Sequence, residues 1–157
     1  CARVVPARSG HIPPCYPHHH PMNSDITVIN AHPRTRLRRE AIGASVERVL
    51  AAGKVKGGTV NVILVDDEEL LRMNREHLKH DYYTDVITFL LEEKPLEGEI
   101  YISVDRAREQ AAEYKVGLYE EIKRLAIHGT LHLLGHDDAT DAQREAMRRL
   151  EDRFLAV

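Results

Sequence analysis

The chain has 157 residues, of which 43% are hydrophobic and 30% charged, a composition typical of one globular domain with a substantial core. Its formal net charge of −3 excludes a nucleic-acid binder that works through overall positive charge, so an RNA-binding surface would be a local basic patch. No apolar run approaches the roughly 20 residues that span a bilayer, so we expect no membrane partner. The only cysteines, Cys1 and Cys15, leave the rest of the chain without a thiol nucleophile, which fits a cytoplasmic protein.

Residues 1–21 follow neither helical nor strand periodicity. The segment 10–21 is rich in proline and histidine, and it lacks the continuous apolar stretch of a signal peptide. The three histidines at 18–20 could bind a metal, although an incidental tract is the simpler interpretation. We therefore predict a disordered N-terminal extension over 1–21, of upstream or artificial origin, followed by a single domain over 22–157.

The first half of this domain predicts alternating strands and helices. Residues 26–29 form a β-branched run typical of a strand, and the apolar stripe over 33–52 predicts a helix. Residues 59–65 are nearly all apolar, which indicates a central strand, and Asp66 is the expected N-cap of the next helix. Four arginines at the start of the first helix could hold phosphates or form a solvated surface: Arg34, Arg36, Arg38 and Arg39.

The second half predicts a hairpin and then helices. Strands over 86–91 and 99–103 are joined by a tight turn at 95–98. The three helices that follow span 105–114, 118–134 and 140–154. In the last of them, four side chains are expected to face inward: Ala142, Ala146, Leu150 and Phe154. This order predicts an α+β fold, a mixed α/β sandwich in which helices cover a four-stranded mixed sheet.

Two histidines on the second-last helix form the centre of the predicted site. His128 and His132 are four residues apart, so both imidazoles lie on one helix face. Gly135 ends the helix, because glycine adopts the left-handed conformation freely, and the chain can then bring back Asp138 or His136. Two helical histidines and one ligand from the next turn are typical of an open zinc site. We favour Asp138, because the longer turn lets it complete a tetrahedral arrangement.

The spacing also resembles the site helix of the zincin metallopeptidases. In that motif a glutamate directly after the first histidine is the general base, but the chain has Gly129 there. Asp137 is a candidate to orient an imidazole from outside the ligand set. His128 and His132 could instead be ordinary core histidines. A metal site explains better why two histidines lie four residues apart on one face of a buried helix, because buried polar groups without partners are costly.

Residues 128–135, His-Gly-Thr-Leu-His-Leu-Leu-Gly, resemble the signature of the YbeY endoribonuclease family. Segments 71–74, 84–89 and 98–103 agree with that family in the same order, so the resemblance covers about residues 25–154. It implies a single YbeY-like metal-dependent hydrolase domain with one Zn²⁺ per chain. The implied activity is that of a single-strand-specific endoribonuclease, which acts in 16S rRNA 3′ end maturation and ribosome quality control. It also implies ribosomal RNA and ribosome or small-subunit proteins as partners. A zincin-like metallopeptidase and a non-catalytic ribosome-associated zinc module are the alternatives.

The chain departs from the family pattern at two positions. Many members carry histidine as the third ligand, where this chain has Asp138. The family commonly has an arginine where this chain has Leu78, and three basic neighbours could stabilise phosphate charge instead: Lys79, Arg75 and Arg72. The two arginines also fit a plain helix surface. His136 is a candidate proton shuttle, or only a turn residue.

Overall fold

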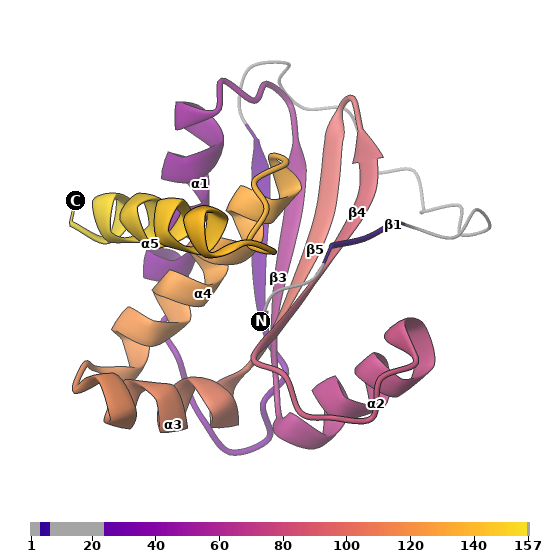
Figure 1. Ribbon diagram of the computed structural model, residues 1–157, viewed down its shortest axis with the longest axis vertical. Coiled ribbons are helices and arrows are strands. Elements are labelled where there is room, and N and C mark those ends of the chain that lie inside the picture. The colour runs from indigo at the N-terminus through magenta and orange to yellow at the C-terminus, as the bar shows by residue number, and fades with distance from the viewer. Residues whose placement is uncertain (1–3, 7–23, 157) are drawn as a thin grey trace.

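The computed structural model describes residues 4–6 and 24–156, and its helices pack around one mixed sheet (Figure 1). The strand order is β1-β4-β5-β3-β2. Strands β2, β3 and β5 are parallel, β4 runs antiparallel to β5, and β1 pairs parallel with β4. The strands are β1 (Val4–Pro6), β2 (Asp25–Asn30), β3 (Thr59–Val65), β4 (Val86–Glu93) and β5 (Leu96–Ser103). The predicted α+β fold is confirmed, and all four predicted strands are present.

Strand β1 is an addition to the prediction. It lies within the segment that we predicted to be a disordered extension, and pairs with residues 88–90 of β4. Valine favours extended backbone, and the edge of β4 away from β5 is open to a further strand. Residues 1–3 and 7–21, including the histidines at 18–20, lie outside the described residues.

The helices cover the two faces of the sheet unequally. They are α1 (Arg39–Ala52), α2 (Asp67–Leu78), α3 (Val104–Tyr114), α4 (Leu118–Leu133) and α5 (Asp141–Leu155). Ile100 and Ile102 of β5 pack in the cluster that contains residues of α1 and α4, whereas the intervening Tyr101 packs with residues of α2. Because alternate side chains of a strand point to opposite faces, α1 and α4 cover one face and α2 covers the other (Figure 1).

Glycines let α4 lie directly on the sheet. A Cβ on Gly129 of α4 would stand 2.8 Å from Ile100 Cγ2, and one on Gly98 would stand 2.6 Å from Leu133 of α4. The prediction that Gly98 ends a turn is therefore wrong. The hairpin turn is Lys94–Pro95, β5 begins at Leu96, and Gly98 is a strand residue on which the helix packs.

The first helix begins later than predicted, at Arg39 instead of at the start of the 33–52 stripe. Side chains from the end of β2 hold the intervening residues in a loop. His32 Nδ1 accepts hydrogen bonds from the backbone N–H groups of Arg34 at 3.2 Å and Thr35 at 3.0 Å, and the Asn30 amide donates to the Thr35 carbonyl at 2.8 Å. Most of the four arginines therefore lie ahead of the helix.

Helix α5 turns a different face inward than predicted. Ala142 and Ala146 are exposed, whereas Met147 and Glu151 are buried. Two predicted side chains, Leu150 and Phe154, are partly buried beside them. The difference matters because it places a carboxylate against α4.

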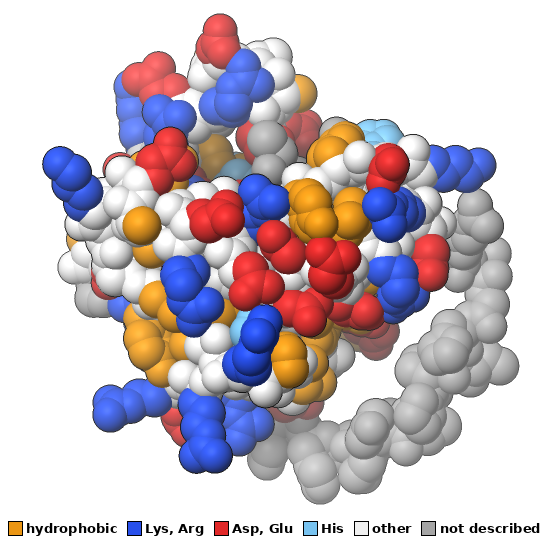
Figure 2. Space-filling view, turned by 90° about the horizontal axis from the view of Figure 1, so that it is seen from below, with side chains coloured by type: hydrophobic (Ala, Val, Ile, Leu, Met, Phe, Trp, Pro, Cys, Tyr) orange, Lys and Arg blue, Asp and Glu red, His pale blue; other side chains and the backbone are white. Residues whose placement is uncertain are grey.

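The carboxyl ends of the parallel strands form an acidic edge of the molecule. Helices α2 and α3 begin here, and their first turns carry acids that stabilise the positive helix ends: Asp67, Glu68, Glu69 and Asp105. Figure 2 views the molecule from this side and shows acidic side chains gathered near its centre. In the described part of the chain, no helix is long and apolar enough to cross a membrane.

Candidate metal centre

Three predicted ligand side chains converge at the end of α4. His132 Nε2 lies 3.1 Å from His128 Nε2, and Asp138 Oδ2 lies 3.4 Å from His128 Nε2 and 3.5 Å from His132 Nε2. Among the described residues this is the one group of at least three His, Cys, Asp or Glu side chains arranged to hold a metal ion. The His132 side chain is 4% exposed and the Asp138 side chain 21% exposed, so the group is partly sheltered but reachable.

The convergence depends on how α4 ends. The backbone N–H of His136 donates to the Leu131 carbonyl and that of Gly135 donates to the His132 carbonyl, both at 3.0 Å. Gly135 has a φ of +94°, as glycine beyond a helix end commonly does, so the pattern is a Schellman motif. The chain reverses there and returns Asp138 to the histidines.

The geometry fits a tetrahedral ion. Bonds of about 2.0–2.1 Å from zinc to its ligands place neighbouring ligand atoms about 3.3 Å apart. The observed separations of 3.1, 3.4 and 3.5 Å match this value. Two imidazoles and one carboxylate would leave a fourth position for water or a substrate oxygen.

A buried carboxylate that we did not predict orients one of the histidines. Glu151 of α5 is 2% exposed, and its Oε1 accepts a hydrogen bond of 2.9 Å from His128 Nδ1. This bond puts the proton on Nδ1 and leaves the Nε2 lone pair facing the site. The guanidinium of Arg124 lies 3.1 Å from Glu151 and also pairs with buried Glu121, so the carboxylate has a charged partner. The sequence gives one indication of the role of Glu151, because this acid lies within the apolar stripe formed by Met147, Leu150 and Phe154.

The environment keeps His132 neutral. Burial lowers the pKa of His132, and the neighbouring His128 lowers it further. Asp138 and a hydrogen bond with the backbone of His136 act in the opposite direction, but the pKa stays below its ordinary value. A neutral imidazole is the form that binds a metal.

Comparison with known proteins identifies the family. The family model described as endoribonuclease YbeY matches residues 26–157. The chain belongs to the endoribonuclease YbeY family. A protein of Parabacteroides distasonis named endoribonuclease YbeY is 37% identical over 122 residues, which are 77% of this chain and 86% of that one. A protein of the same name from Salinibacter ruber is 32% identical and covers 92% of this chain and 94% of its own.

A solved structure agrees with the fold. The solution structure of TM1509 from Thermotoga maritima has a TM-score of 0.62 and 29% identity, and covers 83% of this chain and 86% of that one. Of the three companion segments that suggested the YbeY family, 71–74 belongs to α2 on the far face of the sheet, and the other two lie beside the site helix. Residues 84–89 and 98–103 fall mostly in β4 and β5, under α4.

The YbeY signature departs from the zincin motif for a packing reason. Gly129 faces the sheet, where a Cβ would stand 2.8 Å from Ile100 Cγ2 and 3.1 Å from Thr88 Oγ1. A glutamate could not be accommodated there without separating α4 from the sheet. The position of the zincin general base is therefore too crowded for a glutamate.

Other predicted site residues lie elsewhere. Arg75 and Lys79 belong to α2 and its C-cap, on the opposite face of the sheet from α4. Arg75 pairs with Asp81 at 2.5 Å, and Leu78 packs in the apolar cluster under α2. The structure therefore does not bring these basic residues to the three ligands, and Arg72 likewise pairs with acids of its own helix.

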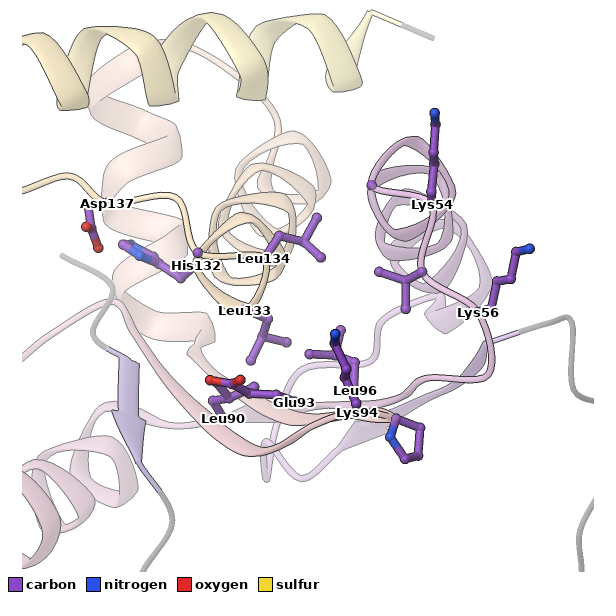
Figure 3. Close-up of a pocket in the computed structure, with 14 residues that line it drawn as sticks. Lys54, Lys56, Leu90, Glu93, Lys94, Leu96, His132, Leu133, Leu134 and Asp137 are labelled. Atoms are coloured by element: carbon purple, nitrogen blue, oxygen red, sulfur yellow. The ribbon is translucent and has the colours of Figure 1, made fainter.

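The turn after α4 holds the two remaining candidates. His136 is exposed and does not belong to the converging group, so the structure favours Asp138 over its rival as the third ligand. Asp137 is also exposed and lines a groove beside His132 (Figure 3). The part we had assigned to Asp137, orienting an imidazole, is filled by Glu151.

Proposed function

We propose that the chain is a metal-dependent endoribonuclease that cleaves single-stranded RNA and holds one Zn²⁺ per chain through His128, His132 and Asp138. The observation that carries this proposal is the approach of three ligand atoms to within 3.5 Å of one another on YbeY signature residues. Imidazole nitrogens and carboxylate oxygens are the ligands that zinc prefers in hydrolytic sites. The relatives are named endoribonucleases, which supports RNA phosphodiester cleavage as the reaction class.

The zinc that His128, His132 and Asp138 would hold would supply Lewis acidity toward a phosphoryl oxygen or a water molecule. The chain's own residues prepare for that chemistry. Glu151 fixes the tautomer of His128, and burial keeps His132 unprotonated. We assign proton transfer to the leaving oxygen to His136, because it is exposed in the turn that carries Asp138 and an imidazole can both donate and accept a proton.

We also propose ribosomal RNA as the substrate. Membership of the YbeY family supports a role in 16S rRNA 3′ end maturation and ribosome quality control, in contact with the ribosome or small-subunit proteins in the cytoplasm. This part of the proposal rests on family membership alone. The chemistry at the metal centre is independent of it.

Cleavage assays test the reaction class. A labelled single-stranded RNA, the same RNA as a duplex, and casein are incubated with the protein, with and without a chelator. We expect cleavage of the single strand only, lost on chelation, restored by zinc, and absent from His128→Ala and His132→Ala. His77→Ala, which removes an exposed imidazole of α2, is the matched control and should cleave normally. Casein cleavage would instead indicate a metallopeptidase, and chelator-sensitive stability with no cleavage would indicate a structural zinc module.

A second experiment tests the third ligand. Native mass spectrometry should find far less zinc in Asp138→Ala than in His136→Ala, because only Asp138 belongs to the converging group. Asp138→His should retain zinc, since imidazole can replace the carboxylate. Equal zinc contents in the two alanine variants would show that the ligand is wrongly assigned.

A further inference from the structure

A groove of about 630 Å³ lies beside the metal centre. Figure 3 shows His132 and Asp137 at one end of it and Lys54 and Lys56 at the other, with Lys94 on the hairpin between β4 and β5. Aliphatic side chains form much of its lining: Val55, Leu90, Leu96, Leu133 and Leu134. The groove therefore joins a predicted catalytic ion to an apolar surface with a basic rim.

The three lysines are available to an anion. All of them are exposed, and within the described part of the chain none of their ammonium groups has an ion pair or hydrogen bond. The groove also contains Glu93 and Asp137, so its formal charge is +1 without a metal, whereas the whole chain carries −3. Positive charge concentrated in a cleft of an otherwise acidic protein steers anions to that cleft.

The turn that carries Lys54 is held in place relative to the metal centre. The turn that carries Lys54 packs against the end of α4, where a Cβ on Gly53 would stand 2.8 Å from Leu134 Cδ1. Backbone hydrogen bonds of 3.0 Å from Lys54 to Ala51 and from Val55 to Leu50 fix the turn on α1. The same stretch of α4 supplies His132, so the turn that carries Lys54 and the predicted ligands share one support.

One other part of the surface is unfavourable for a polyanion. The acidic edge at the carboxyl ends of the parallel strands would repel phosphates (Figure 2). The groove lies elsewhere, where the end of α4, the turn after α1 and the β4–β5 hairpin meet. A single strand suits it better than a duplex, because unpaired bases can turn toward apolar side chains while the phosphates face cations.

We propose that this groove binds the single-stranded RNA that flanks the cleaved phosphodiester, with Lys54, Lys56 and Lys94 contacting its phosphates and the aliphatic floor contacting its bases. This inference rests on the proposed function. It adds a substrate-binding surface that lies outside the metal ligands.

The test is binding of a 12-nucleotide single-stranded RNA to the zinc-loaded protein, measured by fluorescence anisotropy. The probe is a 2′-O-methyl phosphorothioate, which keeps its charge and resists cleavage. In about 0.1 M salt each lost phosphate contact weakens binding about fivefold, so a Lys54→Gln, Lys56→Gln, Lys94→Gln variant should bind about 100-fold more weakly. The slope of log affinity against log salt should fall by about 2.

A control variant carries the same change of charge outside the groove, through Lys115→Gln, Lys123→Gln and Arg153→Gln. Lys115 is a close match to Lys54, because both follow helix ends with a φ of 57°. The control should bind RNA as the wild type does. Equal weakening of both variants, or unchanged affinity and slope in the groove variant, would overturn the proposal. So would lysine-dependent binding of an acidic peptide that is tighter than binding of RNA.

Cleavage separates this inference from the proposed function. The groove variant should cleave a long RNA with a raised KM, and the control variant should cleave it with the KM of the wild type. If the wild type cleaves RNA and the groove variant has a normal KM on long RNA, the groove assignment fails and the nuclease assignment stands. If the wild type cleaves no RNA, the proposed function itself fails.

Discussion

Replacement of Glu151 tests how the metal centre is organised. Glu151→Gln keeps an oxygen that can accept from His128 Nδ1 but removes the charge. Hydrogen bonds to charged groups stabilise by about 1.5–3 kcal/mol and neutral ones by about 0.5–1.5 kcal/mol, so the charge contributes about 1.4 kcal/mol, or about tenfold in zinc affinity. Glu151→Ala removes the acceptor as well, and the loss should approach the 100-fold that such outer partners reach, about 2.7 kcal/mol.

The structure also sets the expected effect on stability. Arg124 loses one partner in both variants but keeps Glu121, and its side chain is 24% exposed. The unfolding free energy of the metal-free protein should therefore fall by less than the roughly 3–5 kcal/mol seen when a buried charge loses its only partner.

The assay is a zinc titration against a chromogenic chelator, with urea unfolding of the metal-free protein alongside it. Glu145→Gln is the control, because Glu145 lies on the same helix in an exposed ion pair with Arg149. It should leave zinc affinity unchanged. Wild-type zinc affinity in both Glu151 variants, or an equal loss in the control, would refute the claim that Glu151 holds His128 in its binding tautomer.

Three further predictions concern packing, the helix end and pH. Gly129→Ala should lower the free energy of unfolding, measured in urea, by about 1–3 kcal/mol, because the added Cβ would crowd the sheet. The control Gly43→Ala, whose Cβ would have no neighbour nearer than 3.7 Å, should raise that free energy by about 0.5–1 kcal/mol. Similar effects of the two substitutions would contradict the close packing of α4 on the sheet. Gly135→Ala should cost about 1 kcal/mol and weaken zinc binding, since alanine adopts a φ of +94° reluctantly; unchanged zinc affinity would show that the turn does not position the third ligand. Because the pKa of His132 is lowered in the folded state, its contribution to the stability of the metal-free protein should be fully present above about pH 6.5 and should be lost as the pH falls toward the folded pKa. His132→Asn should flatten the dependence of the unfolding free energy on pH. Equal slopes of unfolding free energy against pH in the two proteins would contradict the shift.

The features that could be predicted from the sequence depend on short stretches of chain. Asp66 caps α2 by accepting from the Glu69 N–H at 2.9 Å, as its position before an acidic first turn indicates. Gly135 ends α4 for the reason the sequence suggests, and this local event is sufficient to bring the third ligand back. The spacing of the histidines needs only the helix itself.

The features that the sequence did not reveal depend on contacts between distant segments. Gly98 resembles a turn residue until Leu133 is packed over it. Glu151 resembles a surface acid of an amphipathic helix until α5 is placed against His128. The basic side chains near Leu78 are close to the motif in sequence, but strand alternation puts α2 on the other face of the sheet. For Gly98 and for Glu151 the decisive partner is more than 20 residues away in sequence.

The central claim is that His128, His132 and Asp138 bind one ion. Anomalous diffraction at the zinc absorption edge, from crystals grown with zinc, tests it most directly. We predict one peak about 2.0–2.2 Å from Nε2 of each histidine and from a carboxylate oxygen of Asp138. A peak bound by other side chains, or no peak between these three at full zinc occupancy in solution, would contradict the account.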